Sequence, residues 1–121
     1  MSTRARFAAA ALLVAAVVAL YTPALSFELM GDDYQWVQHA HAAMHRPHLL
    51  FSDLDTFYRP ANTWTLVVDR LLWPSRPLGY HLTNLLLQAL AGLALVAAAR
   101  RLGLSEGAAW ALGAVWALSP F

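Results

Sequence analysis

Residues 82–99 read LTNLLLQALAGLALVAAA, and the pair Arg100-Arg101 follows them directly. The stretch carries no charged residue, and its few polar residues all lie near its beginning. An uncharged helix of about 20 residues is long enough to cross the hydrocarbon core of a bilayer. These residues therefore predict a membrane-spanning helix, and this helix decides the class of fold.

A second uncharged stretch, residues 7–27, follows a basic N-terminus, residues 1–6, that contains Arg4 and Arg6. Its length predicts the first membrane span. A secretory signal peptide is the alternative, because Ala24-Leu25-Ser26 resembles a small-residue cleavage site. Both interpretations place the next residues of the chain outside the cytoplasm.

A third apolar stretch, residues 107–121, comes after a short turn, residues 100–106. It is shorter than a complete span requires, so we expect a third membrane helix that the end of the sequence truncates. The three stretches together predict an all-α, polytopic membrane protein. Its first loop, residues 28–81, is large enough to carry a functional site.

The composition agrees with a membrane protein and excludes several other classes. The chain is 60% hydrophobic and 12% charged, whereas a soluble domain is roughly 45–50% apolar and about 25% charged. The absence of cysteine excludes a disulfide framework, a thiolate metal site and a cysteine nucleophile. A net charge of +1 gives no reason to expect a nucleic-acid partner.

The arginines predict the orientation of the chain. Arg4 and Arg6 precede the first span, and Arg100-Arg101 come directly after the second. Basic residues flanking spans favour the cytoplasmic side, so residues 1–6 and 100–106 are expected there. The loop of residues 28–81 would then be periplasmic, with the chain in the inner membrane as a multi-pass protein.

The loop is predicted to contain two interfacial helices joined by an acidic turn. The first begins near Asp33 and ends at Pro47, with apolar residues at helical spacing. The second is expected to start with Asn62 as its N-cap and to close at Pro74 and Pro77. Its apolar stripe comprises Trp64, Val67, Val68, Leu71 and Leu72.

Four short motifs occur in an order that is similar to a known family. They are Gly31-Asp32-Asp33-Tyr34, Phe57-Tyr58-Arg59-Pro60, the run from Leu78 to Leu87, and Ala117-Leu118-Ser119-Pro120. As an ordered set they resemble the N-terminal part of GT-C glycosyltransferases, in particular the protein O-mannosyltransferase-like families. The resemblance covers nearly the whole chain. One departure is Gln88, since the relatives often carry histidine there.

The resemblance implies a sugar transferase that uses a polyprenyl-phosphate-linked sugar as donor, with membrane lipid as its environment. It implies Asp32 as the general base that accepts the proton of the acceptor hydroxyl. Asp33 would be a supporting acid that orients the acceptor or a divalent ion. The residues alone leave another interpretation open, in which Asp32 or Asp33 caps the helix beginning there.

Three further residues are candidates for substrate binding. Arg59 carries a guanidinium whose fork of N–H groups matches phosphate oxygens; its alternative is an ion pair with Asp53 or Asp55 in the same loop. His81 and Asn84 lie one helical turn apart at the mouth of the second span and can face one cavity.

No metal site is predicted. His41, His45 and His48 lie close together in sequence, but the spacing fixes no third ligand, so a solvated loop face is the expected role. The chain by itself is expected to be inactive as an enzyme. The alternative function is a small, non-enzymatic membrane protein with a structural or partner-binding loop.

Overall fold

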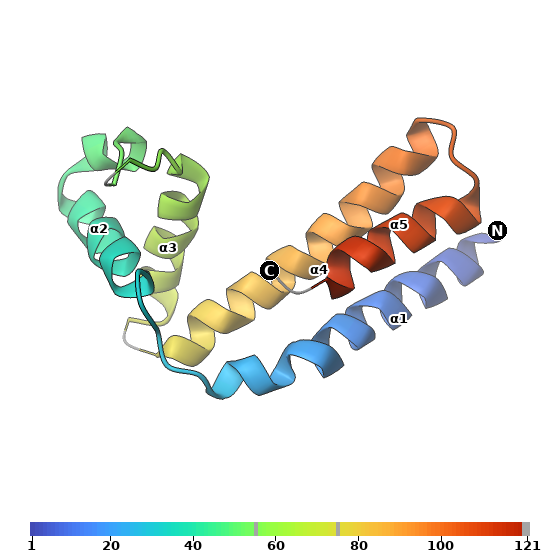
Figure 1. Ribbon diagram of the computed structural model, residues 1–121, viewed down its shortest axis with the longest axis horizontal. Helices are drawn as coiled ribbons and strands as arrows, with labels where there is room; N and C mark the ends of the chain where they lie inside the picture. Colours follow the sequence, from blue (N-terminus) through green and yellow to red (C-terminus); the bar gives the residue numbers. More distant parts are fainter. Residues whose placement is uncertain (55, 75, 120–121) are drawn as a thin grey trace. The chain divides into compact units, whose positions relative to one another are not determined.

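The computed structural model describes residues 1–54, 56–74 and 76–119, and every regular element in them is helical. The helices are α1 (Thr3–Tyr21), η1 (Thr22–Ser26), α2 (Asp33–His45), η2 (Pro47–Phe51), α3 (Pro60–Leu72), α4 (Pro77–Arg101) and α5 (Glu106–Leu118) (Figure 1). The predicted all-α class is confirmed. The segments Thr3–Ser26 and Pro77–Arg101 are each long and apolar enough to cross a membrane.

The chain forms two compact units, and it passes from one to the other inside η1 and again inside α4. The first unit combines Met1–Ala24 with the chain from Asn84 onward, and the second is Leu25–Thr83. The first unit therefore contains the apolar helices, and the second contains the predicted loop.

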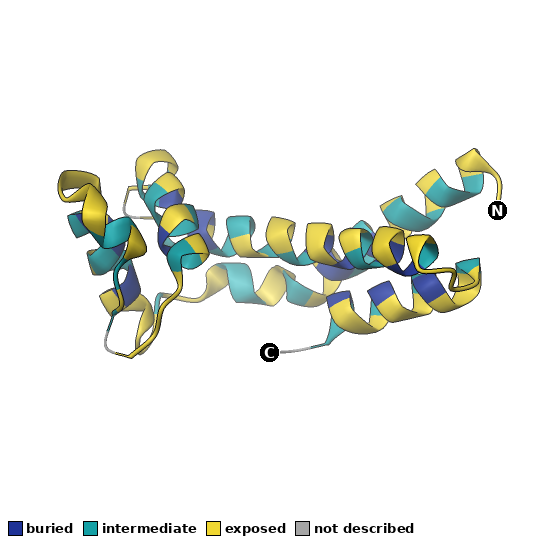
Figure 2. Ribbon diagram, turned by 90° about the horizontal axis from the view of Figure 1, so that it is seen from above, coloured by how far each residue is buried: buried dark blue, intermediate teal, exposed yellow. Residues whose placement is uncertain are grey.

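In the first unit, α1 and α5 lie side by side with the apolar part of α4 (Figure 1). Their shared core contains Leu13 and Val17 of α1, Ala89 of α4 and Ala117 of α5. Within the first unit, the dark-blue positions in Figure 2 mark this narrow buried seam, while the outer faces are largely exposed. Those outer faces are apolar as well, which suits contact with lipid chains.

Small residues allow α4 and α5 to approach closely. A Cβ atom added at Gly113 would collide with a methyl group of Val96 and would lie 2.8 Å from the carbonyl oxygen of Gly92. A Cβ atom added at Gly92 would lie 2.8 Å from the Cβ of Ala117. Glycine and alanine at a crossing bring helix backbones together, as is common between membrane helices.

Hydrogen bonds from two polar side chains connect the helices of this unit. The side-chain amide of Gln88 donates to the carbonyl oxygens of Trp116 and Ala117, at 3.2 and 3.3 Å. The hydroxyl of Tyr21 donates to the carbonyl of Ser119 at 2.8 Å. Gln88, the residue that departs from the resembling family, therefore joins α4 to α5.

In the second unit, α2 packs against α3 (Figure 1). The predicted helix beginning near Asp33 is present, and Trp36, Ala40 and Ala43 form its buried face. The side chain of His39 bonds the carbonyl of Leu49 at 3.1 Å and so ties α2 to η2.

Two predicted helix boundaries in this unit were wrong. The helix α3 begins at Pro60 with Arg59 at its N-cap, so Asn62 lies inside the first turn instead of capping it. The helix α4 begins at Pro77, although this proline was expected to close the preceding helix. Both errors have one cause, which is that proline was not considered as the first residue of a helix. The first turn of a helix does not need the N–H that proline lacks, and the fixed φ of proline favours that turn.

The apolar stripe of α3 faces outward. Of its five residues, Val67 is half-buried and the other four, Trp64, Val68, Leu71 and Leu72, are exposed. The buried positions of the helix are the polar residues Thr63 and Asp69. An apolar face of this kind suits a helix that lies against a membrane interface, as the sequence predicts.

Candidate functional site

The two acids of the Gly31-Asp32-Asp33-Tyr34 motif lie at the start of α2 and have different surroundings. Asp32 occupies the N-cap position, and its carbonyl accepts from the amides of Gln35 and Trp36 at 3.0 and 3.1 Å. Its carboxylate makes no capping hydrogen bond. The carboxylate of Asp33 turns back and accepts from the amide of Met30 at 3.0 Å.

Gly31 makes this turn possible. Its φ of 59° lies in the left-handed region, which side-chain-bearing residues seldom adopt. The turn leaves both acids exposed at the beginning of the helix. The helix-capping interpretation therefore applies in part to Asp33, whose side chain fixes the turn, and does not apply to the side chain of Asp32.

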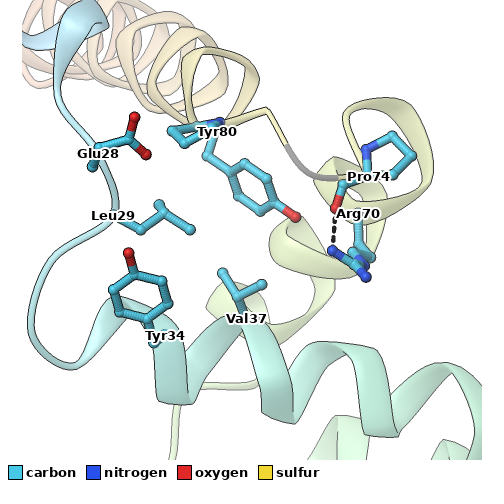
Figure 3. Close-up of a pocket in the computed structure, with 8 residues that line it drawn as sticks. Glu28, Leu29, Tyr34, Val37, Arg70, Pro74 and Tyr80 are labelled. Atoms are coloured by element: carbon cyan, nitrogen blue, oxygen red, sulfur yellow. Dashed lines mark hydrogen bonds between the residues drawn. The ribbon is translucent and has the colours of Figure 1, made fainter.

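A pocket of about 270 Å³ lies within the second unit, next to this motif in sequence. It is formed by the segment before α2, the first turns of α2, the end of α3 and the start of α4 (Figure 3). Its lining residues are Glu28, Leu29, Tyr34, Val37, Arg70, Pro74, Pro77 and Tyr80. The motif thus contributes Tyr34 to the pocket, while Asp32 and Asp33 are not among its lining residues.

Tyr80 contributes a buried hydroxyl group without a hydrogen-bond partner among the described residues to this pocket. Only 3% of the residue is exposed, and its hydroxyl has no hydrogen-bond partner among the described residues. Figure 3 shows the hydroxyl directed toward the end of α3, where the guanidinium of Arg70 bonds the carbonyl of Pro74. A buried hydroxyl without a partner costs about 1–3 kcal/mol, so a polar ligand atom in the pocket would be stabilised there.

Arg59 is held by aromatic rings. Its guanidinium carbon lies 5.4 Å from the ring centre of Trp36 and 4.6 Å from that of Phe57. No ion pair with Asp53 is present among the described residues, and Asp55 lies outside them. Cation–π contacts of this kind orient the guanidinium but leave its charge unneutralised.

His81 and Asn84 have different surroundings. The Nε2 atom of His81 lies 2.9 Å from the carbonyl oxygen of Phe27. Because a carbonyl oxygen only accepts, Nε2 is the donor in this contact. His81 therefore ties the start of α4 to the segment before α2. Asn84 is exposed and begins the part of α4 that belongs to the first unit.

The histidines of α2 form no metal centre in the part of the chain that the structure describes, where no group of three potential ligands occurs. His41 and His45 contact each other edge to face, with ring centres 5.4 Å apart.

Asp69 is a buried acid that sequence reasoning missed. Only 2% of the residue is exposed, and its Oδ1 atom accepts from the hydroxyl of Thr83. Desolvation by burial raises the pKa of Asp69, and the hydrogen bond from Thr83 offsets part of this rise. The sequence did contain one signal: Asp69 is the single acid of this helix, and it lies on the side opposite the apolar stripe.

The raised pKa of Asp69 predicts a pH-dependent stability. Folding favours the protonated acid, so this contribution is complete below the ordinary aspartate pKa and is lost as pH rises through the raised value. We expect Asp69→Asn, which stays neutral and keeps an acceptor, to flatten the dependence of the unfolding temperature between pH 4 and pH 8. Asp69→Leu should cost about 1–3 kcal/mol, because the hydroxyl of Thr83 loses its partner.

Thermal unfolding in detergent measures both effects, with the exposed Asp53→Asn as the matched control. An Asp69→Asn variant with the same pH dependence as the parent protein would show that Asp69 does not titrate in this range.

Comparison with known proteins found no matching family model, no similar curated protein and no similar solved structure. The family resemblance therefore depends on the ordered motifs alone.

Proposed function

We propose that the chain is part of a membrane glycosyltransferase that moves a sugar from a polyprenyl-phosphate donor to an acceptor hydroxyl on the non-cytoplasmic face. The position of Asp32 and the freedom of its carboxylate from a capping role carry the proposal. Asp32 belongs to the ordered motifs, comes after an apolar segment long enough to cross a membrane, and presents a carboxylate that the helix does not use as a cap.

In this mechanism the acceptor oxygen attacks the anomeric carbon of the sugar. The bond from that carbon to the phosphate oxygen breaks, and polyprenyl phosphate leaves with the electron pair. The carboxylate of Asp32 accepts the acceptor's proton as the new bond forms. Asp33, fixed by its bond to the Met30 amide, holds the turn and keeps Asp32 in place.

Arg59 is the proposed partner of the donor phosphate. Its guanidinium is always charged and is oriented by Trp36 and Phe57. A fixed positive charge stabilises the negative charge that develops on the leaving phosphate. His81 and Asn84 are further candidates for contacts with the substrate.

The pocket beside the motif is the proposed site for part of the sugar or the acceptor. Tyr34 and Tyr80 supply ring faces and hydroxyls, and Glu28 and Arg70 supply charged groups of both signs. Sugars present both apolar ring faces and hydroxyls, so a lining that combines aromatic rings with hydrogen-bonding groups suits them.

The proposed location is the inner membrane, with the second unit in the periplasm, because Arg4, Arg6, Arg100 and Arg101 flank the opposite ends of the two apolar helices. Function and orientation can be tested together with the complete gene product in vesicles that contain a labelled polyprenyl-phosphate sugar. Transfer to a membrane-impermeant acceptor is expected in right-side-out vesicles only. Absence of transfer in both orientations would reject the enzyme, and transfer only in inverted vesicles would reject the orientation.

The second candidate is a small, non-enzymatic membrane protein with a structural or partner-binding loop. The exposed apolar face of α3 and the turn-forming bond of Asp33 favour it, since neither requires a reaction. A stop codon directly after Phe121 in the source gene, with no transfer activity, would decide for this candidate. A reading frame that continues into further spans would favour the enzyme.

A further inference from the structure

A groove in the first unit combines an apolar wall with a basic end. It has a volume of about 280 Å³, and its apolar wall includes Phe7 and Ala10 of α1 with Leu93 and Ala97 of α4. At its end lie the side chains of Arg6 and Arg100. All of these residues belong to the first unit.

The basic end is built around one acid. Glu106, the first residue of α5, accepts from Arg6 at 2.5 Å and from the Nε atom of Arg100 at 3.0 Å. Figure 1 shows the first turns of α1 beside the connection between α4 and α5, where this cluster forms. Two guanidinium groups therefore share one carboxylate, and the cluster keeps a net positive charge.

The carboxyl group of Glu106 stays ionised at neutral pH. Desolvation raises the pKa of Glu106, but the hydrogen bond from Arg6 and the charges of Arg100 and Arg6 outweigh it, so the pKa is lowered overall. Glu106 thus remains an anion at neutral pH and neutralises one of the two arginines. Arg4 and Arg101, the near neighbours of these arginines in sequence, add further positive charge at the same end of the helices.

Hydrogen-bond donors remain unused at this end of the groove. The Nε atom of Arg6 and the indole nitrogen of Trp110 are buried without a partner among the described residues, and the ion pair of Arg100 uses only its Nε atom. The Oε2 atom of Glu106 is a buried acceptor without a partner in the same set. The surplus of N–H groups suits a ligand that brings several acceptor oxygens, which is the character of a phosphate group.

We infer that this groove binds an anionic phospholipid, with the headgroup phosphate at Arg6, Arg100 and Trp110 and an acyl chain along Phe7, Ala10, Leu93 and Ala97. The apolar wall belongs to helices that are long enough to cross a membrane, so the ligand reaches it from the bilayer. Basic pockets between membrane helices bind anionic headgroups for the same electrostatic reason. The site is independent of the proposed transferase activity.

The test uses the complete gene product in a neutral detergent, with phosphatidylglycerol, phosphatidylcholine or inorganic phosphate added. Phosphatidylglycerol is expected to raise the unfolding temperature in a concentration-dependent way. Equal stabilisation by phosphatidylcholine would indicate a general lipid effect, and equal stabilisation by inorganic phosphate would indicate a simple anion site. Either result, or no effect of phosphatidylglycerol, would overturn the inference.

Variants separate the headgroup contacts from the chain contacts. The double variant Arg6→Gln, Arg100→Gln should weaken phosphatidylglycerol binding about tenfold or more, whereas Arg46→Gln, an exposed arginine in the other unit, should leave it unchanged. Because the double variant also removes ion pairs to Glu106, Ala97→Phe provides a second test: it fills the groove and leaves every arginine in place. Unchanged binding in Ala97→Phe would overturn the inference.

Discussion

Replacing Asp32 with asparagine is expected to lower sugar transfer by about 10²–10⁴-fold, the usual effect of losing a general base. The amide has the shape of the carboxylate but cannot accept the acceptor's proton at neutral pH. The variant should remain folded and inserted in the membrane, because the Asp32 carboxylate makes no capping hydrogen bond and is exposed. Activity and folding are therefore expected to separate at this residue.

Two neighbouring variants make the comparison specific. Asp33→Asn keeps an oxygen that can accept from the Met30 amide, so the turn should persist and the activity should fall less. Asp53→Asn removes an exposed loop acid and should leave transfer unchanged. The measurement is initial transfer rate in membranes, normalised to the amount of inserted protein. An Asp32→Asn variant with parental activity would exclude Asp32 as the base.

The helices of this chain could largely be predicted from its sequence, because apolar runs and helical periodicity report directly on helix formation. The residues that begin α3 and α4 were missed for a local reason. Proline ends a helix that precedes it, but Pro60 and Pro77 each serve as the first residue of a new helix. Weighing the helical pattern on both sides of each proline would have found both starts.

The candidate site could be predicted only in part. The acid pair stands out because two carboxylates beside an apolar run are unusual, and a single sequence motif contains both. Tyr80 and Asp69 give no such signal, since their burial depends on the packing of segments that are distant in sequence. The contact of Arg59 with Trp36 depends in the same way on how α3 packs against α2. Local patterns do not encode these contacts.

Local sequence patterns also fail to show which glycines lie in close helix contacts. Gly107 and Gly113 lie in one helix, and alanine comes directly after each of them. A Cβ atom at Gly107 would meet nothing within 4 Å, whereas one at Gly113 would meet Val96 and the backbone of Gly92. Helix propensity favours alanine over glycine, by about 1 kcal/mol in a helix interior; Gly113 lies in the interior of α5, and Gly107 lies in its first turn. The structure therefore predicts opposite outcomes for two similar substitutions.

Gly113→Ala is expected to destabilise the first unit by about 1–3 kcal/mol, the usual cost of forcing an extra carbon into a closely packed contact. The methyl group of Val96 belongs to a buried, β-branched side chain, and the Gly92 carbonyl oxygen, 2.8 Å from the added carbon, belongs to the helix backbone. The contact is therefore relieved only if α4 and α5 separate. Such a separation would also strain the bonds from Gln88 to the carbonyls of α5. Gly107→Ala, the matched control in the same helix, should be neutral or slightly stabilising. Unfolding by SDS in mixed micelles, followed by circular dichroism, measures the difference, and equal stability of the two variants would show that α4 and α5 do not pack through Gly113.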